Sequence, residues 1–250
     1  MSLFLRPRLL HHLRRRSSIA VPLLGLALAS AAALSVSSRS AASLSVAALS
    51  AARADDAGFT ALFDGKTLNG WKVVNQHGDG YGVKDGILFC AKGGGGNLYT
   101  EREYGDFALR FQFRMPPEGS NNGVGIRAPL EGDAAYVGME IQILDEKAAL
   151  GGKWGKLRET QYHGSLYDVL AAKRGAMKPA GEWNEEEIVA KGRQLTVTLN
   201  GTVILDVNLD SITDPAVREK HPGLARTRGH IGFLGHGDYL ELRDIRIKEL

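Results

Sequence analysis

The feature that most constrains the fold is a series of short runs in which apolar and polar residues alternate, separated by glycine-rich turns. Residues 107–115 place Phe, Leu, Phe, Phe and Met at every second position, and residues 195–199 repeat the pattern. A period of two puts these apolar side chains on one face of an extended strand. Apart from a short segment at 214–219, helical periodicity is nearly absent after residue 55. We therefore expect an all-β chain.

Turn chemistry locates two hairpins and one bulge. Asp85-Gly86 and Asn200-Gly201 each lie between two β-type runs, and both pairs favour the positive φ angles of a two-residue hairpin loop. In the last run the apolar residues change from even-numbered to odd-numbered positions near Asp244. A bulge there would keep them all on one face of the strand. Ten or more short strands without alternating helices indicate a single two-sheet antiparallel β-sandwich of the jelly-roll type, with no second domain.

Residues 1–54 differ from the rest of the chain. They hold seven arginines and no lysine or acidic residue, an apolar stretch over about 19–36, and a final small-x-small site that ends at Ala54. This order is typical of a signal peptide cleaved near Ala54. A twin-arginine signal and an uncleaved anchor are the alternatives. We expect a signal peptide and leader over 1–54, a domain over 55–250, and a periplasmic or secreted protein.

The position of the charges excludes one class of partner. The whole chain carries a formal net charge of +3, but removing the seven arginines of residues 1–54 leaves −4 on residues 55–250. We therefore expect no nucleic-acid surface, and membrane contact only through an uncleaved N-terminal segment. Cys90 is the single cysteine and ends an apolar run, so we expect it to be a buried side chain outside any disulfide.

Two predicted strands carry polar residues on a face that glycine keeps open. In 136–144 the apolar positions send Glu140 and Gln142 outward, and in 121–127 they leave two glycines and Arg127 on the outer side. If these strands are neighbours, they form a shallow groove large enough for a sugar. An ordinary solvent-facing sheet surface is the alternative interpretation.

Histidines beside glycine provide further candidates. His163 and His236 lie in glycine-flanked segments, and loops at the rim of a sandwich often carry functional side chains. A structural role is the alternative for each of them. His77 and His221 are expected at the surface, and His230 is expected to be structural at the start of a strand.

Several standard catalytic motifs are missing from the sequence. It contains no Gly-x-Ser-x-Gly elbow, no phosphate-binding glycine loop and no paired-cysteine metal site. Retaining glycosidases need two carboxyl groups about 5 Å apart. The position after Glu140 on the same face is Gln142, however, and Asp145 has the opposite parity. A conventional two-carboxylate mechanism is therefore not expected.

Six segments in a fixed order resemble one known family. Together they resemble the 3-keto-disaccharide hydrolase domain, formerly a domain of unknown function, which has a concanavalin A-like jelly-roll fold. The likeness covers residues 58–250. The segments are FDGKTLNGW (63–71), GMEIQILD (138–145), HGSLYD (163–168), KPAGEWN (178–184), LNG (199–201) and the stretch from GFLGHG (232–237) to the C-terminus.

The resemblance implies cleavage of glycosides whose C3 hydroxyl has already been oxidised to a ketone. The ketone acidifies the C2 proton, so a base can remove it, the enolate expels the C1 substituent, and water then adds. This route needs one base of near-neutral pKa and a positive group or a metal on the enolate oxygen. It also implies a functional link to a glycoside 3-dehydrogenase, which makes the ketone.

The resemblance also implies site residues. Catalytic roles fall to Glu140, His163 and Arg127. Some members of the family use a divalent metal, which Glu140 and His163 would hold here with Asp145 or His236, and no organic cofactor is expected. Substrate binding is expected from four further side chains: Gln142, Tyr167, Lys178 and His236.

One departure from the family pattern and two alternative functions complete the expectations. Leu234 stands where the family commonly has glutamine, which would alter the substrate preference if that side chain touches substrate. Trp183 and Asn184 are expected to begin a strand and pack the sandwich. Because fold does not determine function, a non-catalytic carbohydrate-binding module is the main alternative, and a periplasmic partner-binding domain is the third.

Overall fold

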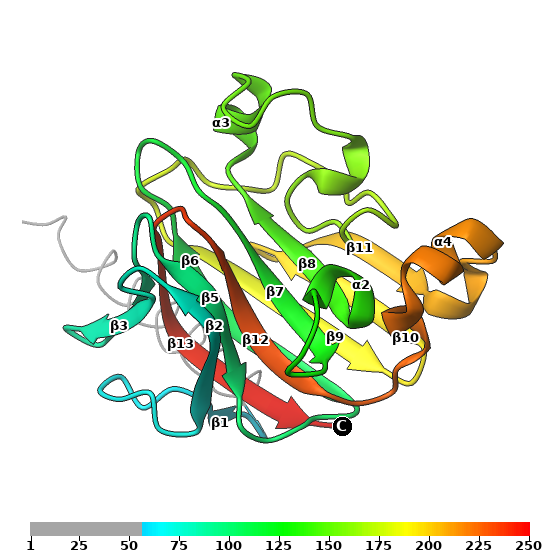
Figure 1. Cartoon of the computed structure of the whole chain (residues 1–250), viewed down its shortest axis with the longest axis horizontal. Coiled ribbons are helices and arrows are strands. Elements are labelled where there is room, and N and C mark those ends of the chain that lie inside the picture. Colours follow the sequence, from blue (N-terminus) through cyan, green and yellow to red (C-terminus); the bar gives the residue numbers. More distant parts are fainter. Residues whose placement is uncertain (1–56) are drawn as a thin grey trace, which may run out of the picture. The chain divides into compact units, whose positions relative to one another are not determined.

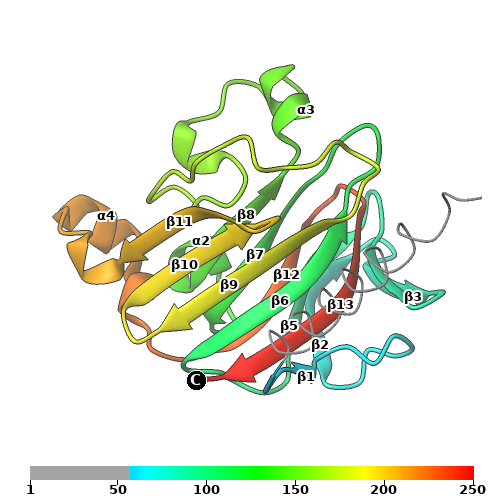
Figure 2. The same cartoon turned by 180° about the vertical axis from the view of Figure 1, so that it is seen from behind.

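The alternating runs of the sequence build two antiparallel sheets that pack face to face (Figures 1 and 2). A computed structural model describes residues 57–250, so the predicted signal peptide and leader over 1–54 lie outside the described residues. Within 57–250 no helix is both long enough and apolar enough to cross a membrane. The all-β sandwich that the sequence predicts is confirmed.

The larger sheet has eight strands. Seven of them follow the order β11-β10-β9-β6-β13-β4-β3, and the eighth, β1, pairs with β13 outside this order. The strands are β1 (Thr60–Ala61), β3 (Tyr81–Lys84), β4 (Ile87–Cys90), β6 (Phe107–Arg114), β9 (Asn184–Lys191), β10 (Gln194–Leu199), β11 (Thr202–Asn208) and β13 (Leu240–Glu249).

The smaller sheet has five strands in the order β2-β5-β12-β7-β8. They are β2 (Trp71–His77), β5 (Gly95–Thr100), β7 (Asn121–Ala128), β8 (Met139–Leu144) and β12 (His230–His236). Short helices occupy the connections: α2 (Ala134–Val137), α3 (Glu146–Leu150), α4 (Pro215–Lys220), and the 3-10 turns η1 (Glu159–Gln161), η2 (Leu209–Ser211) and η3 (Pro222–Ala225).

The predicted turns occur where the sequence placed them. Asp85 and Asn200 have φ angles of 51° and 50°, each is followed by a glycine with positive φ, and they close the β3–β4 and β10–β11 hairpins. Asp244 also has a positive φ, at the register shift between β13 and β6. The predicted helical segment at 214–219 corresponds to α4. Both hairpins and the bulge are therefore confirmed.

The core lies between the inner faces of the two sheets. Phe107, Leu109, Phe111 and Phe113 of β6 are at most 1% exposed, as the alternation predicts. Burying each such side chain contributes about 1.5–3 kcal/mol to the stability of the fold. Cys90 is also buried, which confirms its prediction as a core side chain.

The predicted strand over 136–144 is wrong at its beginning. Residues 134–137 form α2, because the Asp133 side chain accepts a hydrogen bond from the Ala135 backbone N–H at 3.0 Å and caps the helix. Gly138 then permits close packing, since a Cβ there would lie 2.7 Å from the Cβ of Ala128. The strand starts only at Met139. Tyr136 is therefore helical.

A loop segment after η1 extends the smaller sheet beyond β8. The backbone N–H groups of Gly164 and Tyr167 donate to the carbonyls of Gln142 and Glu140, and Gln142 donates back to Ser165. These bonds, 2.8 to 3.1 Å long, hold the segment beside the edge of β8. Tyr167 is thereby fixed next to Glu140.

Candidate active site

Glycines open the outer face of the smaller sheet. Where β8 pairs with β7, Glu140 lies beside Gly125 and Gln142 lies beside Gly123. On the other side of β7, Gly125 lies beside Gly232 of β12. Glycine at these positions leaves no side chains next to the carboxyl and amide groups. The groove predicted between residues 121–127 and 136–144 is therefore present.

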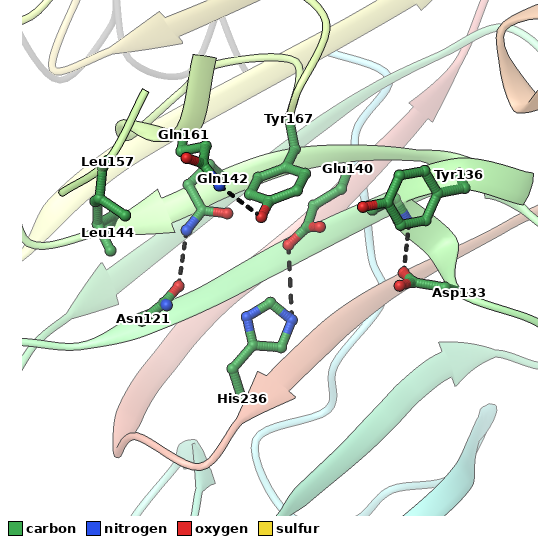
Figure 3. Close-up of a pocket in the computed structure, with 11 residues that line it drawn as sticks. Asn121, Asp133, Tyr136, Glu140, Gln142, Leu144, Leu157, Gln161, Tyr167 and His236 are labelled. Atoms are coloured by element: carbon green, nitrogen blue, oxygen red, sulfur yellow. Dashed lines mark hydrogen bonds and ion pairs between the residues drawn. The ribbon is translucent and has the colours of Figure 1, made fainter. Parts of the chain in front are cut away.

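The groove deepens into a cleft of about 160 Å³. Its floor comes from β7, β8 and the end of β12, one wall comes from α2, and the opposite wall comes from the segment around η1 (Figure 3). The cleft is lined by Asn121, Asp133, Ala135, Tyr136, Glu140, Gln142, Leu144, Leu157, Gln161, Tyr167 and His236.

Glu140 and His236 meet at the centre of the floor. Glu140 Oε1 lies 3.7 Å from His236 Nε2, and Figure 3 shows the carboxyl and the ring directed at each other. The Glu140 side chain is 3% exposed, whereas that of His236 is 39% exposed. Among the described residues Glu140 Oε1 has no hydrogen-bond partner. A buried acceptor of this kind is available to a hydroxyl group of a bound molecule.

The environment shifts the pKa values of the two groups in opposite directions. Burial, helped by the negative charge of Asp133, raises the pKa of Glu140 to about 8. Burial lowers the pKa of His236 below its ordinary value of 6.5, although the charges of Asp133 and Asp238 oppose this shift. At neutral pH the pair therefore consists of a protonated carboxyl and an unprotonated imidazole. Such a split is typical of an acid and base pair.

Neutral polar groups surround this pair. Gln142 Nε2 donates to Asn121 Oδ1 at 2.7 Å, and its Oε1 is buried without a partner among the described residues. Gln161 Nε2 donates to the Tyr167 hydroxyl at 2.9 Å, which leaves the hydroxyl hydrogen of Tyr167 to donate. The structure thus brings Glu140, Gln142, Tyr167 and His236 into one cleft, as the sequence predicted for these four.

Several lining residues were missed by sequence reasoning. Tyr136 was assigned to a strand, and Asp133, Asn121 and Gln161 were not singled out at all. The parity that identified the glycines of 121–127 also places Asn121 on the outer face, so it could have been found. Asp133 could have been recognised as a helix N-cap, because aspartate is strongly preferred at that position. Gln161 had no comparable signal.

His221 is not at the surface, contrary to the prediction. Its Nδ1 lies 3.0 Å from the Ala135 carbonyl, and its ring packs on Tyr136 with centroids 5.0 Å apart. It supports the α2 wall of the cleft from behind. The other two predictions hold, because His77 is exposed and His230 is buried with Nδ1 2.7 Å from the Thr100 carbonyl.

Arg127 does not reach the cleft, so its predicted catalytic position is wrong. It has a φ of 47° and lies where the β12–β7 register shifts, which turns the side chain away from the floor. Its guanidinium is 1% exposed, donates to the carbonyls of Gly105 and Gly192, and pairs with Asp106 at 3.0 Å. Arg127 therefore ties loops together at the far end of the strand.

His163 also lies outside the cleft, which corrects its predicted catalytic position. Its side chain points between the sheets, where Nε2 lies 3.3 Å from Glu186 Oε2 and both side chains are 0% exposed. Its Nδ1 accepts from the Leu144 N–H at 3.4 Å, and its ring packs against Phe113. The segment that carries His163 pairs with the edge of β8, which sends alternate side chains inward.

The predicted metal-ligand set is not assembled. Asp145 caps α3 by accepting from the Ala148 N–H at 2.7 Å, and His163 lies in the core, so neither meets Glu140. Within residues 57–250 there is no group of three or more His, Cys, Asp or Glu side chains placed to hold a metal ion. Glu140 and His236 alone come together from the predicted ligands, and two groups do not satisfy a typical metal site.

Three further positions lie outside the cleft. Lys178 donates from Nζ to the Trp183 carbonyl at 3.0 Å and lines a different groove with Asp145, so it does not join the other predicted substrate-binding side chains in the cleft. Trp183 lies between the guanidinium groups of Arg114 and Arg243, and Asn184 begins β9 as expected. Leu234 packs with Tyr99, Ala128 and Ala134 beside the floor.

The chain is similar to known proteins in sequence and in fold. A 3-keto-disaccharide hydrolase of Bacteroides thetaiotaomicron is 29% identical over 240 residues, which cover 78% of this chain and 80% of that protein. Two crystal structures of candidate glycosyl hydrolases from Parabacteroides distasonis superpose with TM-scores of 0.63 and 0.60 at 25% and 28% identity. The first match covers 77% of this chain and 94% of its relative, and the second covers 72% and 99%.

The family assignment follows from the match to a family model. The model of the 3-keto-alpha-glucoside-1,2-lyase-like domain matches residues 58–248, which include both sheets and every residue that lines the cleft. The chain belongs to the 3-keto-alpha-glucoside-1,2-lyase-like domain family.

Proposed function

We propose that the protein is a carbohydrate hydrolase that cleaves 3-keto-glycosides at C1, with the Glu140–His236 cleft as its active site. The observation that carries the proposal is the adjacency of these two groups, 3.7 Å apart, with pKa values shifted in opposite directions. The family match and the name of the Bacteroides relative support the substrate class.

The first step is removal of the C2 proton. The C3 ketone acidifies this proton, and the unprotonated Nε2 of His236 accepts it while the C2–H electron pair forms the enolate between C2 and C3. Negative charge develops on the C3 oxygen. Gln142 and Tyr167 lie beside Glu140 and provide neutral hydrogen-bond donors for this oxygen. Preorganised donors of this type stabilise a developing oxyanion.

The second step is departure of the group at C1. The enolate re-forms the ketone, a double bond forms between C1 and C2, and the C1–O bond breaks. The protonated carboxyl of Glu140 donates its proton to the leaving oxygen, so the aglycone departs as a neutral alcohol. His236 is then protonated and Glu140 is ionised. If the unsaturated sugar leaves at this stage, one proton transfer across the pair restores the starting state; if it stays, the pair is ready for the addition of water.

Water addition completes the hydrolysis. A water molecule adds its oxygen to C1 and a proton to C2 of the unsaturated keto sugar, with the same two groups acting in reverse. The family is described as lyase-like and the relative is named a hydrolase. The two descriptions correspond to the same elimination, without and with the addition of water.

The two roles can be separated by the choice of leaving group. A 4-nitrophenyl leaving group needs no protonation, whereas a methyl leaving group does. Glu140→Gln is therefore expected to retain most activity on 4-nitrophenyl 3-keto-glucoside and to lose it on the methyl 3-keto-glucoside. His236→Gln is expected to lose activity on both, and the exposed His77→Gln serves as the control.

Other outcomes would contradict the proposal. Absence of turnover of either substrate by the wild-type protein would reject it, and sugar binding without turnover would favour a carbohydrate-binding module. Loss of both activities in Glu140→Gln and retention in His236→Gln would exchange the two assigned roles. Exchange of the C2 hydrogen with deuterium from solvent provides an independent readout of the first step.

The route also sets the context in which the protein acts. Its substrate requires prior oxidation at C3, so we propose that a glycoside 3-dehydrogenase supplies it. We further propose that residues 1–54 direct export and that the protein works in the periplasm or outside the cell. N-terminal sequencing of the protein recovered from the periplasm is expected to begin near Asp55.

A further inference from the structure

The charge that lines the cleft has one sign. Among the eleven lining residues Asp133 and Glu140 are acidic, His236 is unprotonated at neutral pH, and no lysine or arginine is present. The remaining polar lining groups are amides and hydroxyls of uncharged side chains. Since Glu140 holds its proton at neutral pH, Asp133 provides the negative charge of the site.

Asp133 is held in place at the α2 wall. One carboxylate oxygen accepts the Ala135 N–H at 3.0 Å, which fixes the side chain at the start of the helix. Figure 3 shows this carboxylate below Tyr136, at the α2 wall of the cleft. Its charge raises the pKa of both Glu140 and His236. The field of Asp133 therefore acts on the groups that flank the reacting carbon atoms.

Cations on the surrounding loops pair with carboxylates other than Asp133. Lys220 and Arg158 both form ion pairs with Asp168. Lys153 pairs with Asp238 at 3.1 Å and also donates to the Gly119 carbonyl at 2.8 Å. These three cations are held by two carboxylates, Asp168 and Asp238, and none of them forms an ion pair with Asp133 among the described residues.

We propose that Asp133 determines the charge class of the substrate. It makes the cleft take glycosides whose sugar is uncharged or carries a cationic amino group, and it excludes uronic acids and sulfated or phosphorylated sugars. The physical reason is repulsion between like charges, which is one of the two ways in which a site discriminates against the wrong partner. This inference rests on the proposed function and names its substrate class.

The test compares two substrates that differ in one charge. We expect kcat/KM for 4-nitrophenyl 3-keto-glucuronide to be about tenfold or more below that for 4-nitrophenyl 3-keto-glucoside. Asp133→Asn keeps the helix cap, because asparagine caps helices as well as aspartate, and is expected to remove most of this difference. Both substrates use the same acid and base, so their ratio is insensitive to changes in the pKa of Glu140.

Asp214 provides a matched control. It caps α4 through the same contact, accepting the Ala216 N–H at 2.9 Å, and it does not line the cleft. Asp214→Asn is expected to leave the ratio unchanged. Because Asp133 is exposed, about 1 M salt is expected to reduce the discrimination of the wild-type protein.

Two results would overturn the inference: equal kcat/KM for both substrates in the wild-type protein, or a ratio that Asp133→Asn leaves unchanged. If the wild-type protein turns over neither substrate, the proposed function fails, and calorimetric binding then tests the charge class by itself. The inference on the charge class would still be supported if the wild-type protein binds methyl glucuronide more weakly than methyl glucoside and Asp133→Asn binds the two equally. Equal binding in the wild-type protein would reject it.

Discussion

The carboxyl group of Glu140 lies directly over Gly123. A Cβ added at position 123 would stand 2.8 Å from Glu140 Cδ, too close for the present arrangement. At Gly125, on the same strand and face, an added Cβ would meet only side-chain atoms, at 3.3 to 3.5 Å. Neither glycine has a positive φ, so a methyl group at these positions tests space and not backbone strain.

Gly123→Ala is therefore expected to move the Glu140 carboxyl away from His236. A misplaced general acid loses much of its contribution, so we expect kcat/KM to fall about 100-fold on a substrate with a poor leaving group. Gly125→Ala is the matched control and should stay within about threefold of wild type, since its neighbours can adjust slightly. Steady-state kinetics with thermal melts checks both, and wild-type activity in Gly123→Ala would contradict the placement of Glu140.

The pH dependence of kcat/KM follows from the acid and base pair. On methyl 3-keto-glucoside, whose leaving group needs a proton, activity should rise as His236 loses its proton, at a pH below 6.5, and fall as Glu140 ionises at about 8. The negative charge of Asp133 raises both pKa values, so Asp133→Asn should move both limbs to lower pH. A profile measured from pH 4 to 10 checks this, and movement of the two limbs in opposite directions would be inconsistent with it.

Glu140→Gln is expected to stabilise the fold at neutral pH. The pKa of Glu140 is about 8 in the fold against an ordinary 4.5, so its contribution to stability is fully present below about pH 4.5 and declines as pH rises toward 8. At pH 7 keeping this group in the fold costs about 2–4 kcal/mol. Urea titrations measure the free energy of unfolding at pH 5 and at pH 8. The difference between these two values should be smaller in Glu140→Gln than in the wild-type protein or in the exposed control Glu182→Gln.

Asp168 links the two walls of the cleft. Its carboxylate pairs with Arg158 and Lys220 and lies 3.7 Å from Nε2 of His221, whose ring packs on Tyr136. Asp168→Asn keeps a residue that tolerates the φ of 60° but removes the charge. We expect KM to rise about three- to tenfold, with kcat within about twofold, because the walls lose a tie while the acid and base remain.

A matched control exists for this substitution as well. Asp244 also has a positive φ, of 51°, and pairs with Arg246 at 2.9 Å on another part of the surface. Asp244→Asn is expected to leave KM unchanged. A fall in kcat alone in Asp168→Asn would indicate that Asp168 acts on the acid and base pair instead of on the width of the cleft.

The His163–Glu186 pair should show strong coupling. Both side chains are 0% exposed, and His163 Nε2 lies 3.3 Å from Glu186 Oε2. Removing Glu186 leaves this nitrogen of His163 without a partner, and removing His163 leaves the Glu186 carboxyl buried without one. Each of His163→Leu and Glu186→Leu is expected to destabilise the fold by about 3–5 kcal/mol, whereas the double variant recovers most of the loss. A double-mutant cycle by urea unfolding measures this, and additive losses would mean that the two side chains do not interact.

The part of the site that lies on regular strands could be predicted from the sequence. Parity alone placed Glu140 and Gln142 on an outer face kept open by glycine, because a strand alternates strictly as long as its register holds. The same rule failed at Arg127, where a positive φ and a register shift turn the chain. A bulge of this kind depends on the neighbouring strand, which the local sequence does not contain.

The walls of the cleft were harder to predict because they depend on contacts between distant segments. Tyr136 reads as part of an alternating strand, yet the Asp133 cap and packing against His221 make it helical. His163 lies beside glycine in a segment that resembles an exposed loop, but that segment pairs with β8 and turns the ring inward. In both cases tertiary contacts overrode the local pattern.

The segment that pairs with β8 has a consequence for solubility. An exposed edge strand presents unpaired N–H and carbonyl groups to which another chain can add. Gly164, Ser165 and Tyr167 form hydrogen bonds with the free side of β8, so the loop that brings Tyr167 to the cleft also covers this edge. Shortening the loop to widen the cleft would therefore expose a strand to intermolecular pairing, and aggregation would limit how far the site can be opened.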